Sequence, residues 1–565
     1  MAHRFNSEDW FVWEQNASPM LLTMSVNPAF NDLRKYLGSC LFNSVIVYEH
    51  DDANNYQARW LFRFDEGRLL GQKMLDMLLC PSYASSFNTG VQVTEERLTK
   101  KAKKIWNNYK NYSLNEAVTV FEDFLQVYYD YYKLGWFTEP TQWHIEYLLS
   151  KYIKKHYKGN VPAADATKAL FVTENESFTV DIIKDLLECA TAFDELLAHD
   201  TILRDLVFTP RNTDFKDRVA DYVFSSGKDA CDSLLKKLQA HSEKYHWKNN
   251  NYFATSFISP KDVLFDLIDE SHIDEKSISN YYSQMIKTVN ESKAKQLVVK
   301  AEIFNELPPY HKSLVGISNS IGSVLIDNRK KNIMMSNSVF DALLGIVSKA
   351  TACSLEDIHL LIPQELRNFI NDPTAYHERF AERRNLFICV QTDFPVVDEL
   401  IDGIDASSEE SVLSWHVPPM WEPYIAEGAV AEAVLGKLNQ TLNLFDSSQA
   451  PTSKLNGVAA FYDADNSIVE GVVRVIRNPK SEQLLDGEIL VAPSTTPDYI
   501  NAINKCKAIV TDWGSQTSHA AIVSRELKKS CIIGTNFATQ VLKTGQRIRI
   551  NFNDGIIEII GAEEK

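Results

Sequence analysis

The sequence predicts a multidomain protein in which a mainly α-helical body, residues 1–400, precedes a small α/β domain, residues 457–565. In the first part apolar residues recur mostly at helical spacing, whereas from residue 457 onward short β-rich runs alternate with short helices. A connecting segment, residues 401–456, is acidic, then proline-rich, then rich in small polar residues. Its end, DSSQAPTSKLNG (446–457), is the best candidate for a flexible linker.

The acidic composition of the chain disfavours two classes of binding partner, nucleic acids and anionic membranes. Lysine and arginine total 58 and aspartate and glutamate total 75, which gives a net charge of −17. Nucleic acids and anionic lipids attract basic patches, so this acidic balance disfavours both as partners. No run of about 18 apolar residues and no signal-peptide core is present, so no membrane span or leader is expected. The eight cysteines form no CxxC pair, which favours reduced thiols in a cytoplasmic protein.

Helix signals in the body become clear at Ser113. Ser113 and Glu116 form an S-x-x-E capping box, and apolar residues follow through the aromatic run YYDYYKLGWF, which Pro140 is expected to end. The aromatic run predicts a packed core, with a hydrophobic ligand pocket between helices as the alternative. Ser354 is expected to cap a later short helix, and SVIVYEH (44–50) predicts a strand. Further helices are predicted at 142–157, 179–199, 213–247, 259–270, 274–303, 311–330 and 338–350.

The C-terminal domain contains short apolar runs that predict a compact α/β fold. Helices are predicted in TPDYINAINKC, SHAAIVSREL and ATQVL. Strands that alternate with short helices are typical of such a domain. The predicted strands are GVAAFY, IVEGVVRVI, GEILVA, KAIVTDW, SCIIG, QRIRINF and GIIEII.

One histidine, His519, stands at the start of the helix predicted in SHAAIVSREL. Thr517 and Ser518 are good N-cap residues, so His519 is expected in the first helical turn. The N-terminal end of a helix offers unpaired N–H groups and a positive potential, which suit a phosphoryl anion and favour neutral imidazole. A neutral imidazole nitrogen can attack phosphorus and form a phosphohistidine. The competing interpretation of a lone histidine is a surface or structural residue.

Four blocks of the C-terminal domain stand in a characteristic order: GEILVAPSTTPDYI, AIVTDWGSQTSHAAIVSREL, IIGT and LKTGQRIRI. With these blocks, residues 457–560 resemble the swivelling phosphohistidine (mobile) domain of the phosphoenolpyruvate-utilising enzymes. That family includes phosphoenolpyruvate synthase, pyruvate phosphate dikinase and rifampicin phosphotransferase. The resemblance implies a swivelling α/β domain in which His519 is the catalytic phosphohistidine. The preceding helical segment more loosely resembles the rifampicin phosphotransferase-like and phosphoenolpyruvate synthase-like proteins.

The resemblance also assigns roles to the loop and helix around His519. Gly514 matches the first glycine of the family's usual Gly-Gly pair, but Ser515 replaces the second. A serine there is costly if the position needs a positive φ angle or a close approach of phosphate, which puts turnover in question. Thr517 matches a threonine that is a regulatory phosphorylation site in some members. Arg525 either holds the helix by an ion pair, the preferred interpretation, or reaches a phosphate.

The missing parts of the family pattern imply a partner. Family enzymes charge the histidine with an ATP-grasp domain and bind phosphoenolpyruvate in a C-terminal barrel. Residues 1–450 contain no glycine-rich phosphate loop and no GxxxxGK[ST] pattern, and the chain stops just after the swivelling domain. We therefore expect a kinase- or dikinase-like phosphotransferase component that binds no metal, with ATP and Mg on a separate ATP-grasp-type chain. The helical body would hold a small-molecule acceptor. The alternative is a non-catalytic or regulatory relative.

Two further clusters were considered. His241 and His246 lie at i,i+5 spacing, which puts the imidazoles on different helix faces and disfavours a metal site. The basic cluster DNRKK (327–331) could meet a phosphorylated ligand, but a plain surface role is the preferred interpretation.

Overall fold

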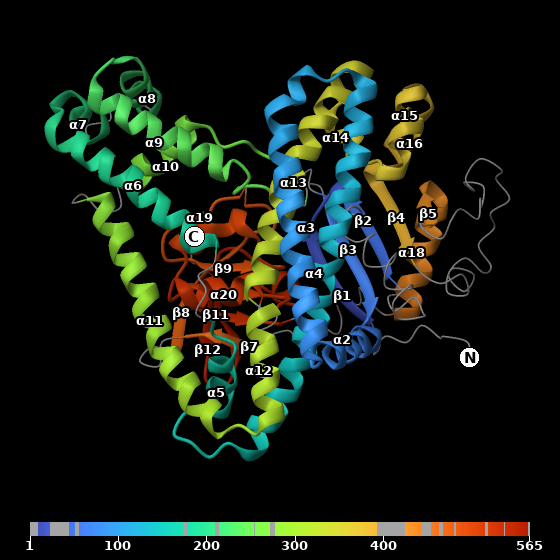
Figure 1. Ribbon diagram of the computed structural model, residues 1–565, viewed down its shortest axis with the longest axis vertical. Coiled ribbons are helices and arrows are strands. Elements are labelled where there is room, and N and C mark those ends of the chain that lie inside the picture. Colours follow the sequence, from blue (N-terminus) through green and yellow to red (C-terminus); the bar gives the residue numbers. More distant parts are fainter. Residues whose placement is uncertain are drawn as a thin grey trace.

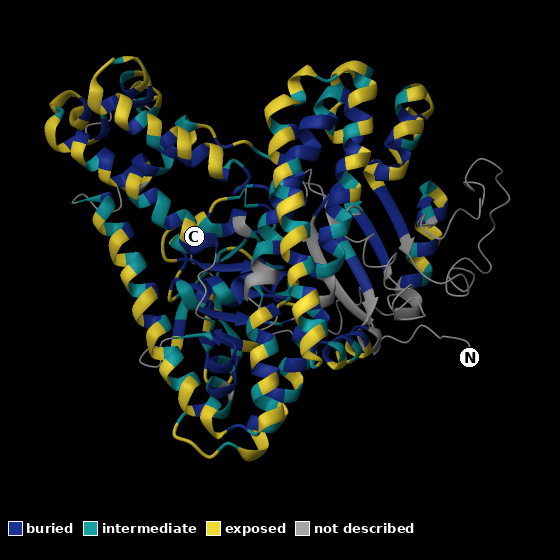
Figure 2. Cartoon of the chain, in the orientation of Figure 1, coloured by how far each residue is buried: buried dark blue, intermediate teal, exposed yellow. Residues whose placement is uncertain are grey.

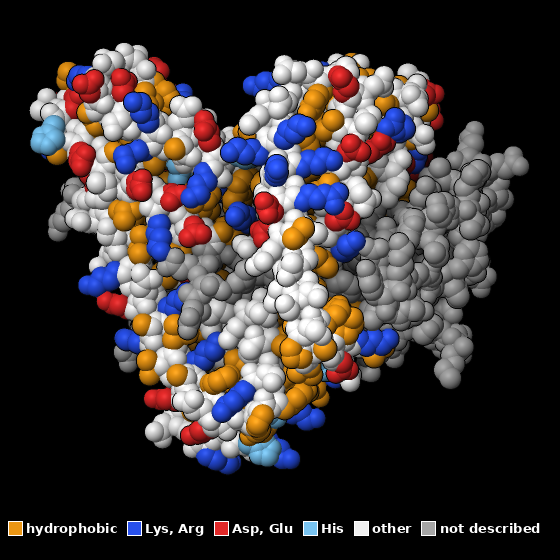
Figure 3. Space-filling model, viewed as in Figure 1, with side chains coloured by type: hydrophobic (Ala, Val, Ile, Leu, Met, Phe, Trp, Pro, Cys, Tyr) orange, Lys and Arg blue, Asp and Glu red, His pale blue; other side chains and the backbone are white. Residues whose placement is uncertain are grey.

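The helices of the body and two β-sheets form one assembly, with the C-terminal sheet lying between α11 and α13 (Figure 1). The body divides in the same view into a lobe around α6–α10 and a group of long helices around α3 and α4. Figure 3 shows a notch between these two parts, with lysine and arginine side chains on its walls. The computed structural model describes residues 10–22, 44–50, 56–173, 178–208, 214–252, 255–271, 277–321, 323–391, 424–442, 454–462, 467–479, 482–514, 518–535 and 537–562.

The helices of the body are largely those that the apolar periodicity predicts, with some predicted helices divided and others joined. None of the helices in the described ranges combines the length and the apolar character that a membrane crossing requires. Their bounds are α2 (Phe64–Leu78), α3 (Pro81–Asn108), α4 (Leu114–His156), α5 (Ala163–Leu170), α6 (Phe178–His199), α7 (Thr201–Phe208), α8 (Phe215–Ser225), α9 (Asp229–Tyr245), α10 (Pro260–Ser271), α11 (Ile278–Glu306), α12 (Pro309–Ile321), α13 (Ser323–Thr351), α14 (Leu355–Ile358), α15 (Leu366–Asn371), α16 (His377–Asn385) and α18 (Gly428–Leu442).

The start of α4 is confirmed, and its predicted end is wrong. Ser113 and Glu116 form the capping box, as Ser354 also caps α14, but the helix continues through Pro140 to His156. Proline removes one backbone donor from a helix, so nearby carbonyl groups need other partners. The carbonyl of Gly135 accepts hydrogen bonds from Thr138 Oγ1 at 2.5 Å and Arg329 Nη1 at 3.2 Å. The bond from Arg329 fixes this part of α4 to α13 beside the proline.

The body also contains a five-stranded antiparallel sheet, of which the sequence predicted only SVIVYEH, now confirmed as β2. Its order is β1-β3-β2-β4-β5, and α18 packs against β4 and β5. Because β5 and α18 lie within 401–456, the prediction that this whole segment is a connection is wrong. Residues 443–453, which hold most of the predicted linker, lie outside the described residues. The strands are β1 (Trp10–Asn16), β2 (Ser44–His50), β3 (Tyr56–Arg63), β4 (Leu386–Gln391) and β5 (Tyr424–Glu427).

The C-terminal domain is an eight-stranded mixed sheet in the order β6-β13-β12-β8-β9-β10-β11-β7. The predicted strands and helices are confirmed, and β6 is an addition that moves the start of the sheet from residue 457 to Lys454. Strands β8, β9, β10 and β11 run parallel. The elements are β6 (Lys454–Asn456), β7 (Val458–Phe461), β8 (Ile468–Val475), β9 (Ile489–Ala492), α19 (Ile500–Lys505), β10 (Ala508–Thr511), α20 (His519–Glu526), β11 (Ser530–Ile533), α21 (Ala538–Val541), β12 (Gln546–Asn551) and β13 (Ile556–Ala562).

The C-terminal domain shares a hydrophobic core with the helical body. One cluster of buried residues runs from helices α6 to α11 into the sheet through α19 and α20, and α11 packs directly on α20. A second cluster, built only from residues of the C-terminal domain, fills the opposite face of the sheet. The central strands β9, β10 and β11 are buried along their whole length, and buried residues are dark blue in Figure 2. The domain is therefore docked on the body through α20.

Strand β6 offers a test of where the domain begins. Leu455 is 1% exposed and belongs to the second core cluster, so Leu455→Ala should lower the free energy of unfolding by about 2–4 kcal/mol. The neighbouring Val458 is 56% exposed, so Val458→Ala should change it by less than about 0.5 kcal/mol. Urea denaturation of both variants measures the difference. Equal stabilities would show that β6 does not contribute to the core.

Candidate active site

His519 is the first residue of α20, as the sequence predicts, and its helix begins with a side-chain cap. Ser518 is the N-cap residue, and its Oγ accepts a hydrogen bond from the backbone N–H of Ala521 at 3.4 Å. Ala520, Ala521 and Val523 of the same helix are buried in the core shared with the body. This packing fixes the helix and holds the His519 backbone at its positive end.

The imidazole of His519 is 3% exposed, and its two nitrogens have different surroundings. Nδ1 lies 2.9 Å from Oγ1 of Thr495, a buried residue of the loop after β9. Nε2 has no hydrogen-bond partner among the described residues. In the tautomer that carries its proton on Nδ1, this proton is donated to Thr495 and the lone pair of Nε2 is available. In that tautomer, Nε2 is the nitrogen available for reaction.

The surroundings of His519 keep it neutral. Burial lowers its pKa well below the usual value of a histidine, and the positive charge of Lys330 on α13 lowers it further. The imidazole is therefore uncharged at neutral pH, as a nucleophile must be. The same cation would stabilise an anion attached to Nε2, because opposite charges attract strongly at a site shielded from water.

The loop before α20 requires a glycine at position 514. Gly514 has a φ angle of +151°, a region that residues with a side chain rarely adopt. A Cβ atom there would also lie 2.9 Å from Oγ of Ser518, the cap of α20. Gly514 therefore permits the turn that precedes His519. Ser515 and Thr517 lie outside the described residues, so their predicted roles stay predictions.

Arg525 lies in the last turn of α20, away from the reactive nitrogen. It is six residues beyond His519, which corresponds to about 9 Å along a helix. Burial lowers the pKa of its guanidinium, while the negative charges of Glu526 and Glu146 act in the opposite direction. The preferred role of Arg525, holding the helix by an ion pair, stays a prediction.

The basic cluster DNRKK is not a plain surface feature, and that interpretation was wrong. Arg329 is 4% exposed, and its Nη2 donates to Oε2 of Glu139 at 2.6 Å, across to α4. The next residue, Lys330, is half-buried and acts on His519. These residues are buried or half-buried because α13 passes between the long helices of the body and the C-terminal domain. Tertiary packing thus turns a surface-like sequence into an interdomain element.

The two other histidines considered from the sequence, His241 and His246, and a groove beside α11 all lie apart from His519. His241 is buried in α9, and His246 stacks on Trp106 with ring centroids 4.4 Å apart. Within the described ranges, no three histidine, cysteine, aspartate or glutamate side chains gather as metal ligands. A groove of about 840 Å³ lies between α11 and α19, but Leu527 and Lys529 place it beyond the C-terminal end of α20. The groove is thus at the opposite end of the helix from His519.

Comparison with known proteins identifies the domain that carries this site. Residues 484–555 match the family model of the PEP-utilising enzyme, mobile domain. The C-terminal domain is a PEP-utilising enzyme mobile domain. The match covers the loop with Thr495, the whole of α20 and the strands around them. The family resemblance and the α/β fold predicted from the sequence are therefore confirmed.

Named relatives resemble the mobile domain and adjoining residues only. A probable phosphoenolpyruvate synthase of Staphylothermus marinus is 44% identical over 97 residues, which are 17% of this chain and 12% of that protein. The phosphoenolpyruvate synthase of Pyrococcus furiosus is 43% identical over 86 residues, 15% of this chain and 10% of that protein. The rifampicin phosphotransferase of Bacillus cereus is 37% identical over 95 residues, which are 17% of this chain and 11% of that protein. The chain thus matches about a tenth of the length of these relatives.

Several residues at the site were not singled out by the sequence analysis. Thr495 and Asp498 stand within the block GEILVAPSTTPDYI, which signalled the family but gave no role to either. Lys330 was part of DNRKK, and Asn251 belongs to the run KNNNY. Their polar side chains alone gave no reason to place them near His519, because they come from three distant segments. Only the docking of the mobile domain brings these segments together.

The lowered pKa of His519 predicts a pH dependence of stability. The unfolded chain binds a proton at this residue near pH 6.5 while the folded chain does not, so stability falls as the pH drops below that value. One pH unit below that value the penalty is on the order of 1 kcal/mol. His519→Gln removes this residue's titration, so the variant should gain about that much relative to wild type between pH 7.5 and 5.5. Urea denaturation at both values tests it, and an unchanged difference would show that folding does not lower the pKa of His519.

Proposed function

We propose that this chain is a phosphotransferase component whose mobile domain carries a phosphoryl group on Nε2 of His519. One observation carries the proposal. A neutral, buried imidazole stands at the first turn of a helix with Nδ1 held by Thr495 and Nε2 unpartnered among the described residues. The match to the mobile-domain family and the relatives named phosphoenolpyruvate synthase and rifampicin phosphotransferase support the same chemistry.

The chemical step follows from the two nitrogens of His519. The lone pair of Nε2 attacks the phosphorus of a phosphoryl donor, the N–P bond forms, and the bond from phosphorus to the leaving oxygen breaks. The Nδ1–H group remains bonded to Thr495, which helps to disperse the positive charge that develops on the ring. In the second half-reaction an acceptor oxygen attacks the same phosphorus and forms an O–P bond, while the N–P bond breaks and its electron pair returns to Nε2. The proton of the acceptor is released to solvent or a base, and neutral His519 is restored.

The donor and the acceptor are assigned to different places. ATP and Mg²⁺ are placed on a separate ATP-grasp-type chain, following the sequence analysis, and would supply the phosphoryl group. A small-molecule acceptor is placed on the helical body beside α13, because Lys330 of that helix lies close enough to His519 to affect its pKa. The mobile domain would turn between the two about the linker that the sequence predicts, residues 446–457, most of which lies outside the described residues.

A regulatory relative is the second candidate, and one observation favours it. Ser515 replaces the second glycine of the family's pair, next to Gly514 with its φ of +151°. If the serine prevents the approach of phosphate, the domain would still dock but would not turn over. Ser515→Gly separates the candidates, because a strong gain in phosphorylation would identify the serine as an impairment.

Phosphorylation of His519 is directly testable. With an ATP-grasp partner and γ- or β-labelled ATP, the chain should acquire a label that is labile to acid and stable to base, as expected of a phosphoramidate. His519→Ala and His519→Gln should abolish the label, because no neighbouring group replaces a covalent carrier. His199 is exposed at the end of α6, and His199→Gln should keep full labelling as the control. Label retained in His519→Ala would contradict the carrier role.

Thr495 provides a graded second test. Thr495→Val removes the hydrogen-bond partner of Nδ1 at nearly constant volume, which leaves a buried polar group unpaired. The rate of labelling should fall about tenfold, equivalent to about 1.4 kcal/mol. Thr495→Ser keeps the hydroxyl group and should retain most of the rate. Equal rates for the valine and serine variants would show that the hydroxyl group does not assist the reaction.

A further inference from the structure

The mobile domain is joined to the body by a buried polar contact close to His519. Nδ2 of Asn251, in the loop after α9, donates to Oδ2 of Asp498 at 2.9 Å. Asn251 is 4% exposed and Asp498 is 9% exposed. A hydrogen bond between an amide and a buried carboxylate is stronger than one between neutral groups, and leaving that carboxylate unpaired is costly. The contact therefore favours the docked position specifically.

On the mobile-domain side, Asp498 belongs to the loop that holds the histidine. Thr495, three residues earlier, is the partner of Nδ1 of His519. The hydroxyl group of Thr496 donates to the other oxygen of Asp498, so both carboxylate oxygens have partners. The backbone N–H of Tyr499 donates a hydrogen bond to the carbonyl of Thr496 at 3.0 Å. A movement of Asp498 would therefore displace Thr495, because a short hydrogen-bonded turn connects the two residues. Thr495 in turn orients His519.

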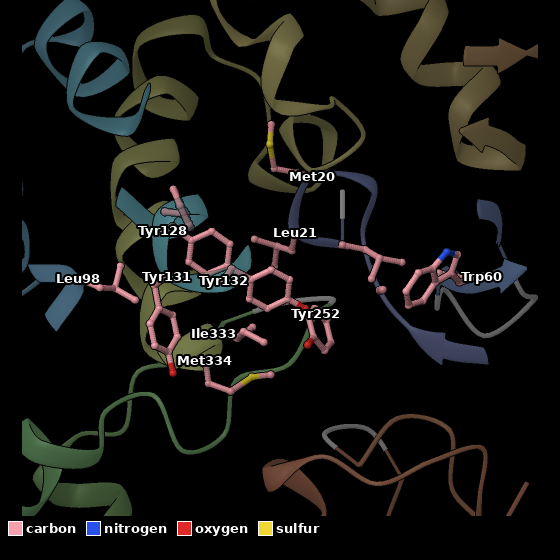
Figure 4. Close-up of a cluster of buried hydrophobic side chains, with 14 of the residues drawn as sticks. Met20, Leu21, Trp60, Leu98, Tyr128, Tyr131, Tyr132, Tyr252, Ile333 and Met334 are labelled. Carbon is pink, nitrogen blue, oxygen red and sulfur yellow. The ribbon is translucent and has the colours of Figure 1, made fainter. Parts of the chain in front are cut away.

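On the body side, Asn251 is held rigidly between two anchored neighbours. Asn250 is fully buried, and its Nδ2 donates to Oγ of Ser338 at 2.6 Å and to the carbonyl of Met334 at 3.0 Å. Figure 4 shows Tyr252 within the aromatic cluster beside Tyr132 and near Met334. Asn337 of α13 donates from Nδ2 to the carbonyl of Asn251 at 3.1 Å. Asn251 therefore has little freedom to adjust if its partner moves.

The same helix presents Lys330 toward His519. Asn337 follows Lys330 by seven residues, which is two helical turns, so both lie on one face of α13 about 10 Å apart. The bridge from Asn337 through Asn251 to Asp498 attaches the mobile domain to that face. With the bridge in place, the imidazole is buried and lies within the electrostatic reach of Lys330 on α13.

We propose that Asn251 is a positioning residue, which docks the mobile domain through Asp498 and closes His519 against α13. The inference deepens the proposed function, because the movement it governs is that of the proposed phosphoryl carrier. Loss of the contact shifts the equilibrium toward an undocked state in which His519 meets solvent. Formation of the contact selects the acceptor-side position.

The accessibility of His519 tests this without any donor or acceptor. Diethyl pyrocarbonate modifies neutral imidazoles that solvent reaches, and trypsin releases residues 508–525, a peptide in which His519 is the single histidine. Asn251→Asp sets two carboxylates against each other and should raise the rate of His519 modification about tenfold, the change expected for loss of a charge-assisted hydrogen bond. Asn249→Asp, in the same turn, should leave the rate unchanged. Mass spectrometry of the peptide over time gives the rates.

A reversed pair distinguishes positioning from general damage. In Asn251→Asp combined with Asp498→Asn, the amide at position 498 donates to the carboxylate at position 251, so the modification rate should return to that of wild type. Asn251→Ser, which removes the donor without adding charge, should give an intermediate rate if Asn251→Asp fails to fold. The inference would be overturned if Asn251→Asp and Asn251→Ser both kept the modification rate of wild type. It would also be overturned if the reversed pair did not restore that rate. If instead His519 is never phosphorylated while these rates behave as expected, the proposed function fails and the positioning role stands.

Discussion

The structure depends on the packing of α20 against both its own sheet and α11 of the body. Apolar residues of this helix belong to the cluster that joins α6–α11 to the C-terminal sheet. His519 is the first residue of the same helix, so docking that buries the apolar face also buries the imidazole. The proposed carrier would have to leave this position to meet its donor, and each departure would expose apolar surface at a cost of roughly 25 cal/mol for each Å². The docked state is therefore held by a combination of apolar area and a few polar contacts that can be exchanged.

Helix α13 gives this arrangement its rigidity. One side of the helix packs on aromatic residues of α4, among which Phe121, Phe124 and Tyr128 surround Phe340. Another side carries Lys330 and Asn337, which lie toward the mobile domain through the contacts described above. Asp341 continues this polar line and pairs with His359 at 2.8 Å. A helix fixed by a large aromatic core can present polar groups at defined positions, because its own movement would disturb many contacts at once.

Electrostatics near His519 favours different states of the imidazole before and after phosphorylation. The chain carries a net charge of −17, yet the histidine lies at a helix N-terminus and under the influence of Lys330. Before phosphorylation, this positive potential and burial keep the ring neutral and nucleophilic. After phosphorylation, the same potential would stabilise the dianionic phosphoryl group. One arrangement would thus serve both the formation and the retention of the proposed phosphohistidine.

The sequence by itself determined the C-terminal domain and the position of His519 within it. The central strands β9, β10 and β11 are short, mostly apolar runs, and Ser518 provides a local cap, so neighbouring residues contain the information. The five-stranded sheet was missed because its strands come from residues 10–63 and 386–427, and only their pairing makes them a sheet. The course of α4 through Pro140 and the roles of Lys330, Asn251 and Asp498 were likewise decided by tertiary structure. In each case the deciding partner is distant in the chain, so local periodicity and spacing contain no trace of it.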